Sequence, residues 1–262
     1  MKEGKKIYFV SDVHLGSPQI ADNQKHERKI VAWLDSIKDS AEEIYLLGDI
    51  FDFWFEYKRS IPKGFSRFIG KLCELNDAGI PVHFFTGNHD IWIFDYLPAE
   101  TGIIVHKKPL ITEIDNFRFF ISHGDGLTRH EKKLKFYKKV FNNRIAQWFF
   151  RWLHPDIGIK LAELWSSQNR KKHVKPEFKG VENEWLIQWA TEKIQKEHFD
   201  YFIFGHRHID KITNLNEKCR LVYLGDWISI FSYGEWDGKE FRLKYFTSNQ
   251  SINHSINQLI FT

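Results

Sequence analysis

The fold is decided by the stretch that reads IYFVSDVHLG, residues 7–16. Its first half, residues 7–11, is an apolar run with the composition of a buried β-strand, and Asp12 and His14 follow at once. Residues two apart in extended backbone project from the same side, so we expect Asp12 and His14 to face one cavity. This stretch therefore predicts a strand whose end carries two side chains able to bind a metal ion.

The same pattern, an apolar run followed by polar side chains, recurs along the chain. Further strands are expected at residues 43–47, 82–86, 110–114, 117–122, 201–204 and 221–224. Four of these runs are followed by polar blocks, which are Gly48-Asp49 with Asp52, Gly87-Asn88-His89-Asp90, His123-Gly124-Asp125 and Gly205-His206 with His208. Loops at the carboxyl ends of strands in an α/β fold share one crevice, so we expect the blocks to converge.

Helical segments separate the first strands. Apolar side chains recur at helical spacing over residues 27–38, and a second helix over residues 65–78 would end before Gly79. A later pair of strands, joined at Asp115-Asn116, is typical of a hairpin. Strands that alternate with helices in this way predict the α/β class.

The length and the distribution of helical signals bear on domain organisation. The chain has 262 residues, 42% of them apolar, which is enough to bury a full core in one domain. Over residues 127–196 strand signals vanish and helical periodicity replaces them. Because strands resume at Tyr201, we interpret this segment as a helical cap inserted into a single domain of residues 1–262.

The inserted segment is basic and aromatic. The chain has a formal charge of +4, whereas residues 129–175 carry 13 Lys or Arg against three Asp or Glu. This combination suits a membrane surface, an anionic lipid or nucleic acid. It also fits a helical pair whose aromatic side chains are core and whose lysines are solvated. The apolar positions at near-helical spacing are Val140, Phe141, Ile145, Trp148, Phe149, Trp152 and Leu153.

Cysteine usage and hydropathy bear on the compartment. Two cysteines, Cys73 and Cys219, are too few for a disulfide framework. The sequence contains neither the apolar run of a signal peptide nor a stretch that approaches a membrane span. We therefore expect a cytoplasmic protein.

The polar blocks contain a set of side chains suited to metal binding. Its members are Asp12, His14, Asp49, Asn88, His123, His206 and His208. Carboxylate, imidazole and amide oxygen together suit Mn²⁺, Fe or Zn²⁺ better than Mg²⁺, and we expect Mn²⁺ first. Seven ligands are too many for one tetrahedral ion and fit two ions bridged by a carboxylate. Asp52 and Asp125 stand beside these ligands and either hold ligand imidazoles or cap turns.

The five blocks match, in order, those of the calcineurin-like metallophosphoesterases, which the chain resembles over residues 7–208. The resemblance implies a β-sandwich flanked by helices, with a two-metal centre at one edge. One ion would be held by Asp12, His14 and His208. The other would be held by Asn88, His123 and His206, with Asp49 bridging the pair.

Within this superfamily the chain is most similar to the UDP-2,3-diacylglucosamine pyrophosphatases of lipid A biosynthesis. The stretches SDVHLG, residues 11–16, and GDIFDFW, residues 48–54, resemble that branch, and the insertion stands where the branch carries its lipid-binding cap. The best-known members have Arg at the position of His89, whereas general phosphoesterases have His there.

The resemblance implies hydrolysis of a phosphoanhydride in a lipid-linked nucleotide sugar, yielding UMP and 2,3-diacylglucosamine 1-phosphate. His89 would protonate the leaving oxygen or stabilise its charge, with Asp90 orienting the ring. We also expect peripheral contact with the cytoplasmic face of the inner membrane. The candidate substrate contacts are Asn88, His89, Ser167, Asn169, Arg170, Lys171 and Lys172.

Two other classes of function stay open. A phosphoesterase of broad specificity, acting on nucleotides or phosphodiesters, would keep the metal centre and use the basic segment for its substrate, although we expect no nucleic-acid partner. A scaffold without activity would keep the metal set for structure alone.

Overall fold

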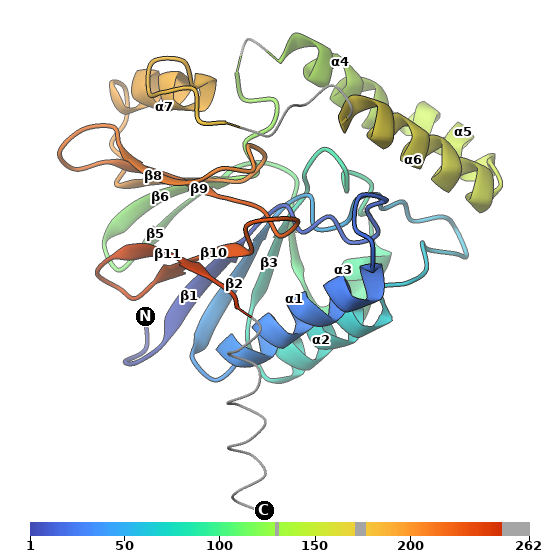
Figure 1. Ribbon diagram of the computed structural model, residues 1–262, viewed down its shortest axis with the longest axis horizontal. Coiled ribbons are helices and arrows are strands. Elements are labelled where there is room, and N and C mark those ends of the chain that lie inside the picture. Colours follow the sequence, from blue (N-terminus) through green and yellow to red (C-terminus); the bar gives the residue numbers. More distant parts are fainter. Residues whose placement is uncertain (129–130, 171–176, 248–262) are drawn as a thin grey trace, which may run out of the picture.

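The computed structural model describes residues 1–128, 131–170 and 177–247, and two β-sheets stand face to face at its centre (Figure 1). The first sheet has the strand order β11-β10-β1-β2-β3-β4. Its strands are β1 Lys6–Val10, β2 Ala41–Leu47, β3 Val82–Phe85, β4 Ile104–His106, β10 Ser232–Trp236 and β11 Phe241–Tyr245. The second sheet has the order β5-β6-β7-β9-β8. Its strands are β5 Leu110–Ile114, β6 Phe117–Ser122, β7 Tyr201–Phe204, β8 Asp210–Asn214 and β9 Arg220–Leu224.

Side chains alternate between the two faces of each strand, and this alternation builds the layers. On β1, Phe9 points between the sheets and packs in one cluster with Ile121 of β6. Its neighbour Val10 points to the outer face and packs with Trp33 and Leu34 of α1. The space between the sheets and the space under the outer helices are therefore separate apolar cores.

Helices cover both outer faces of the sandwich (Figure 1). The first sheet is covered by α1 Asn23–Ile37 and α2 Ser66–Asp77, with the short helix α3 Tyr96–Thr101 beside them. The second sheet is covered by α7 Trp185–Ile194, whose Leu186, Ile187 and Ala190 pack on Phe202 and Phe204 of β7. This arrangement confirms the expected α/β sandwich flanked by helices.

Three helices form a separate layer at one edge, which we call the cap: α4 Lys132–Phe141, α5 Arg144–Trp152 and α6 Pro155–Arg170 (Figure 1). The segment expected as the insertion, residues 127–196, contains these three helices and also α7, which packs on the second sheet. A single domain of residues 1–262 that carries a cap stays a prediction.

All strands expected from the sequence are present to within one or two residues. The hairpin at Asp115-Asn116 is confirmed, since both residues have positive φ, 50° and 67°, as a two-residue turn requires. Four strands were missed: β4, β8, β10 and β11. The first has three residues, and in β8, Asp210–Asn214, two charged residues and two polar residues flank a single central isoleucine. Such short or polar strands carry weak periodicity and are stabilised by their neighbours in the sheet.

Candidate metal centre

The five polar blocks meet at one edge of the sandwich because five parallel strands end there. β1, β2 and β3 run parallel in the first sheet, and β6 and β7 run parallel in the second. The backbone leaves each strand abruptly, and several candidate ligands adopt the left-handed conformation, which residues other than glycine rarely do. These residues and their φ values are Asp12 55°, His14 52°, Asp49 52°, His206 63° and His208 49°.

This conformation corrects one detail of the sequence interpretation. Asp12 and His14 do face one site, but through two left-handed residues and not through extended backbone.

Two glycines allow the loops that follow β2 and β3 to approach each other closely. A Cβ atom on Gly48 would lie 2.7 Å from the backbone nitrogen of Gly87, and one on Gly87 would overlap the Asp49 carboxylate. Any larger residue at either position would push the two loops apart.

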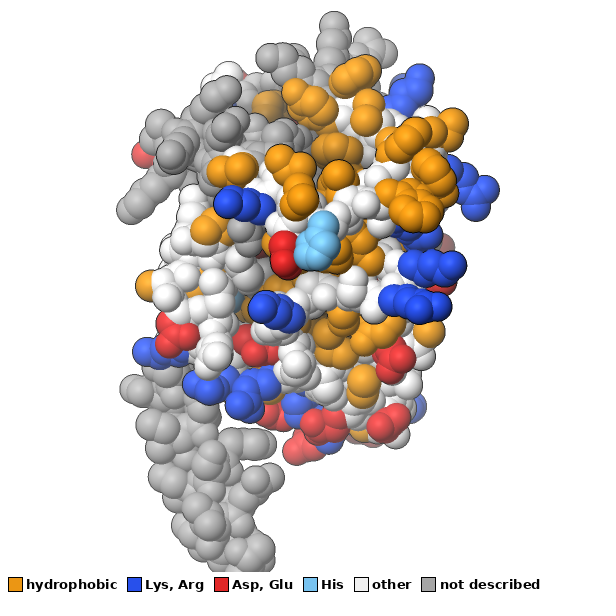
Figure 2. Space-filling model, turned by 90° about the vertical axis from the view of Figure 1, so that its right-hand side faces the viewer, with side chains coloured by type: hydrophobic (Ala, Val, Ile, Leu, Met, Phe, Trp, Pro, Cys, Tyr) orange, Lys and Arg blue, Asp and Glu red, His pale blue; other side chains and the backbone are white. Residues whose placement is uncertain are grey.

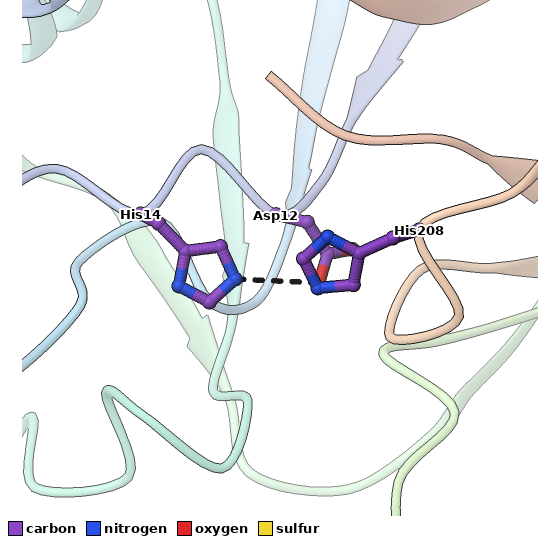
Figure 3. Close-up of side chains that lie close together, drawn as sticks. All are labelled: Asp12, His14 and His208. Atoms are coloured by element: carbon purple, nitrogen blue, oxygen red, sulfur yellow. Dashed lines mark ion pairs between the residues drawn. The ribbon is translucent and has the colours of Figure 1, made fainter. Parts of the chain in front are cut away.

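The Asp12 and Asp49 carboxylates each divide their two oxygens between the backbone and the centre. Oδ2 of Asp12 accepts the backbone N–H of His206 at 2.8 Å, and Oδ1 lies 3.2 Å from Nε2 of His208 and 3.8 Å from Nε2 of His14 (Figure 3). In Asp49, Oδ1 accepts the backbone N–H of His89 at 2.9 Å. One oxygen of each carboxylate is thereby fixed by the fold, and the other faces imidazole nitrogens.

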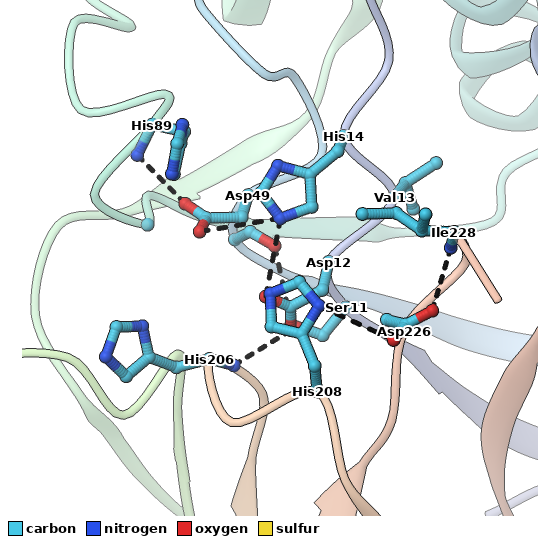
Figure 4. A network of polar contacts seen from close by, with 12 residues as sticks. Ser11, Asp12, Val13, His14, Asp49, His89, His206, His208, Asp226 and Ile228 are labelled. Atoms are coloured by element: carbon cyan, nitrogen blue, oxygen red, sulfur yellow. Dashed lines mark hydrogen bonds and ion pairs between the residues drawn. The ribbon is translucent and has the colours of Figure 1, made fainter. Parts of the chain in front are cut away.

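Asp49 stands between the two halves of the centre (Figure 4). Its Oδ2 lies 3.9 Å from Nε2 of His14 on one side and 3.3 Å from Nε2 of His123 on the other. Ligand atoms of Asp12, His14 and His208 lie within 4.8 Å of one another, and so do those of Asp49, His123 and His206. Asp49 therefore lies within reach of both groups of side chains.

Buried atoms without partners test whether these residues suit metal ions. Within the described part of the chain, four of the seven predicted ligands bury an atom that has no hydrogen-bond partner: Asp12 Oδ1, His14 Nε2, Asn88 Oδ1 and His123 Nε2. Each such atom costs about 1–3 kcal/mol when left unsatisfied. Divalent cations satisfy oxygen and nitrogen atoms of this kind, so the residues present fit a pair of them.

The electrostatics of the centre are dominated by buried carboxylates. Burial alone would raise the pKa of Asp12, but the charge of His208 and the nearby His14 ring lower that pKa to about 2. Burial would lower the pKa of His14, but Asp12 and Asp52 raise it to about 10. The pKa of His123 also rises to about 10, since Asp49 outweighs burial. Metal binding at these nitrogens is therefore coupled to proton release.

Each candidate histidine ligand is oriented by a second group. Nδ1 of His14 lies 3.1 Å from Oδ1 of Asp52, so Asp52 orients the ring of a candidate ligand, which is the first of its two expected roles. The sequence did not indicate the other partners. They are the Leu47 carbonyl, 2.7 Å from His123 Nδ1; Asp226 Oδ2, 3.5 Å from His208 Nδ1; and Glu131 Oε1, 3.4 Å from His206 Nε2. Asp125 differs from the expectation, because its carboxylate pairs with Lys138 of α4.

His89 lies beside the centre, but its partner is not the expected one. A ring nitrogen lies within 4.8 Å of ligand atoms of His14 and Asp49. Its Nδ1 is 3.0 Å from the backbone carbonyl of Asp52, so this carbonyl orients the ring. The carboxylate of Asp90 instead accepts the backbone N–H groups of Gly87 at 2.7 Å and Ile50 at 2.8 Å. Asp90 therefore braces the two loops, and burial followed by the nearby Asp49 raises its pKa to about 7.

The cap contacts the body through a few aromatic side chains. Phe141 and Phe150 pack on the cluster of Phe55, Ile91 and Trp92, with the Phe150 ring 4.7 Å from that of Phe55. Most of the other apolar positions of the cap are exposed. Their exposed fractions include Phe136 64%, Ile145 67%, Trp148 54%, Phe149 63%, Trp152 74% and Ile157 54%. Only Phe141 and Phe150, among the aromatic residues described in the cap, fit the interpretation that its aromatics are core.

Several predicted substrate contacts fall where no side chain is described. The side chains of Ser167, Asn169 and Arg170, and the whole of Lys171 and Lys172, lie outside the described residues. Asn88 and His89 are half-buried, and His89 lies beside the centre. No described helix has both the length and the apolar content of a membrane span.

Residues 5–210 match the calcineurin-like phosphoesterases, and the chain belongs to this family of hydrolases. Among curated proteins it is similar to a UDP-2,3-diacylglucosamine hydrolase of Porphyromonas gingivalis, with 40% identity over 89% of this chain and 94% of the relative. A protein of the same name from Haemophilus influenzae is 28% identical over 85% and 91% of the two chains. A solved dimetal phosphatase from Danio rerio aligns with a TM-score of 0.48 at 12% identity, over 93% of this chain and 99% of that one.

Proposed function

We propose that the protein hydrolyses the diphosphate of UDP-2,3-diacylglucosamine to UMP and 2,3-diacylglucosamine 1-phosphate. The observation that carries the proposal is the convergence of six of the predicted ligands and His89, with buried atoms in need of a partner, in a chain 40% identical to a hydrolase named for this substrate. The two ions would be divalent, Mn²⁺ first, and held as the sequence interpretation assigns them. Such ions supply an activated water and neutralise charge on phosphate oxygens.

The role of His89 follows from the chemistry of the leaving group. Cleavage of a phosphoanhydride releases a phosphate, which is a stable anion near neutral pH and does not need a proton to depart. A cationic donor beside the centre would therefore act mainly by stabilising the developing charge. The Asp52 carbonyl accepts from Nδ1 and fixes the ring in a position to do this. We assign His89 to charge stabilisation and Asn88 to the same substrate phosphate.

The substrate's lipid would be handled by the cap. On the side of the molecule drawn in Figure 2, hydrophobic side chains gather with Lys and Arg around them. Exposed aromatic residues such as Trp148, Phe149 and Trp152 offer more apolar surface than water-facing helices usually do. We propose that this face meets the acyl chains of the substrate at the cytoplasmic surface of the inner membrane, with which the protein associates peripherally.

The test uses the purified full chain with Mn²⁺ and a substrate dispersed in detergent, with products identified by mass spectrometry. UMP and diacylglucosamine 1-phosphate are the expected products, and reaction in ¹⁸O water shows which phosphorus is attacked. The variant Asp49→Ala should lose turnover by about 10³-fold or more, because it removes the group shared by both ions. Equal turnover of UDP-glucosamine without acyl chains would contradict the lipid assignment. Faster hydrolysis of a cyclic nucleotide would favour the broader phosphoesterase.

A further inference from the structure

A basic hollow lies between the cap and the body, formed by residues other than those of the metal centre. Its volume is about 570 Å³, and its lining includes Lys107, Arg144 and Arg151 together with Phe94 and Trp148. Lys107 follows β4, Phe94 lies in the loop after β3, and the others belong to α5. We propose that this hollow binds the phosphate of an anionic lipid headgroup. The inference deepens the membrane contact proposed above and rests on that part of the proposed function.

The cations of the hollow are gathered without matching negative charge. Of the described residues that line it, only Asp95 is acidic. No ion pair within the described residues involves Lys107, Arg144 or Arg151, whereas lysines elsewhere, such as Lys71, are paired with carboxylates. Like charges held together cost free energy, which an anion bound between them would offset.

A single aromatic ring holds two of the cations in place. The guanidinium of Arg151 lies 4.9 Å from the centre of the Phe94 ring, and Nζ of Lys107 lies 5.5 Å from the same centre. These cations come from different elements, yet the ring attracts both to one spot. The hollow is therefore organised before a ligand arrives.

The third cation, Arg144, lies on the same side of the hollow as Arg151 because of its spacing along α5. Arg144, Trp148 and Arg151 are separated by four and three residues on α5, so they share one face of the helix. The Phe141 carbonyl at the end of α4 connects that helix to the body, because it accepts from Gln147 Nε2 of α5 and from Trp92 Nε1 of the body, each at 2.8 Å. A phosphate needs several hydrogen-bond donors from a rigid surface, and this face of α5 supplies the guanidinium groups of Arg144 and Arg151.

The position of Trp148 indicates that the anion belongs to a lipid. Its ring lies 5.0 Å from Phe149 and 5.8 Å from Trp152, which are exposed on the apolar face of the cap. The hollow therefore lies next to the exposed aromatic residues Phe149 and Trp152, with Trp148 between them and the hollow. A headgroup site would have this position if those residues entered a bilayer. Tryptophan beside cationic residues is the usual composition of a protein surface at the level of lipid headgroups.

The experiment compares two charge-matched variants of the full chain. One combines Lys107→Gln, Arg144→Gln and Arg151→Gln; the control combines Lys196→Gln, Lys218→Gln and Lys239→Gln, which are exposed lysines outside the hollow. Binding to phosphatidylcholine vesicles with and without an anionic phospholipid is measured by co-sedimentation. We expect the hollow variant to lose about 10²-fold in affinity for anionic vesicles and the control to change by less than about threefold.

A second arm separates the sources of the phosphate. Calorimetric titration with inorganic phosphate is carried out on the same proteins. If vesicle binding is unchanged in the hollow variant but phosphate binding is lost, the site serves a free phosphate and the lipid assignment is wrong. If neither changes, or if both variants lose vesicle binding equally, the proposal fails. Vesicle binding does not require turnover, so an inactive protein with hollow-dependent binding would contradict the proposed reaction and leave this inference standing.

Discussion

Oε1 of Glu131 lies 3.4 Å from Nε2 of His206, so the residue that precedes the first cap helix contacts a candidate metal ligand. The same glutamate accepts the hydroxyl of Thr128 at 3.0 Å and is buried. A second link joins the cap to the centre, since Lys138 of α4 pairs with Asp125, two residues after His123. The cap is therefore connected to the metal centre through charged groups as well as through aromatic packing.

Changing Glu131 to Gln should weaken metal binding. The variant keeps the size of the side chain but removes the charge that holds the His206 ring, and loss of such a partner typically lowers metal affinity about 10–100-fold. Competition between the protein and a chelator for Mn²⁺ gives the affinity directly. The exposed Glu182→Gln is the matched control. Unchanged Mn²⁺ affinity with slower turnover would mean that Glu131 acts on the substrate.

His89 offers a test of how the leaving group is stabilised. If it acts through positive charge, His89→Arg should retain kcat within about tenfold, whereas His89→Gln should lose about 10²–10³-fold. Both variants are compared with wild type on the same detergent-dispersed substrate. A proton donor would give a different pattern, in which Arg and Gln are equally poor because neither can transfer a proton near neutral pH.

Glu56 is a structural residue whose loss should be costly. It is 2% exposed, and it accepts the backbone N–H groups of Phe94, Asp95, Tyr96 and Leu97 at the start of α3. Hydrogen bonds to a charged group contribute about 1.5–3 kcal/mol each, and Glu56→Ala leaves buried donors without a partner. We expect a loss of at least about 3 kcal/mol in the free energy of unfolding by urea, because several of these bonds are lost together. Glu3→Ala, on an exposed residue, should change it by less than about 0.5 kcal/mol.

A histidine pair away from the metal centre should make stability depend on pH. Nδ1 of His83 lies 2.9 Å from Nε2 of His106, and burial, followed by the charge of His83, lowers the pKa of His106 from its ordinary 6.5. A group whose pKa is lowered by folding contributes stability above pH 6.5 that is lost as pH falls through the lowered value.

The matched variant is His106→Phe, which keeps an aromatic ring against Phe85. In the wild type the ring centres of His106 and Phe85 are 4.5 Å apart. Between about pH 7.5 and pH 5, it should lose less unfolding free energy than the wild type, because it has no proton to take up. Urea unfolding at both pH values, without added metal, measures the difference. His154→Gln, on an exposed histidine, should parallel the wild type. Parallel curves for wild type and His106→Phe would show that the pair does not respond to pH.

The side chains that carry the chemistry, and their order along the chain, could be predicted from local sequence patterns alone. Strand runs such as Phe117–Ser122 are strongly apolar, and the polar residues that follow them stand out against this background. From such local patterns the α/β class and the candidate ligands could be predicted, because periodicity and composition act over a few neighbouring residues.

The groups that orient those candidate ligands became evident only from the packing of distant segments. Asp226 beside His208 and Glu131 beside His206 look like ordinary loop acids in the sequence, and the latter pair is separated by 75 positions. The left-handed backbone at Asp12 and the division of its carboxylate oxygens likewise depend on how the strand ends pack. Contacts between distant segments exist only after two sheets have packed together, and no local pattern records them.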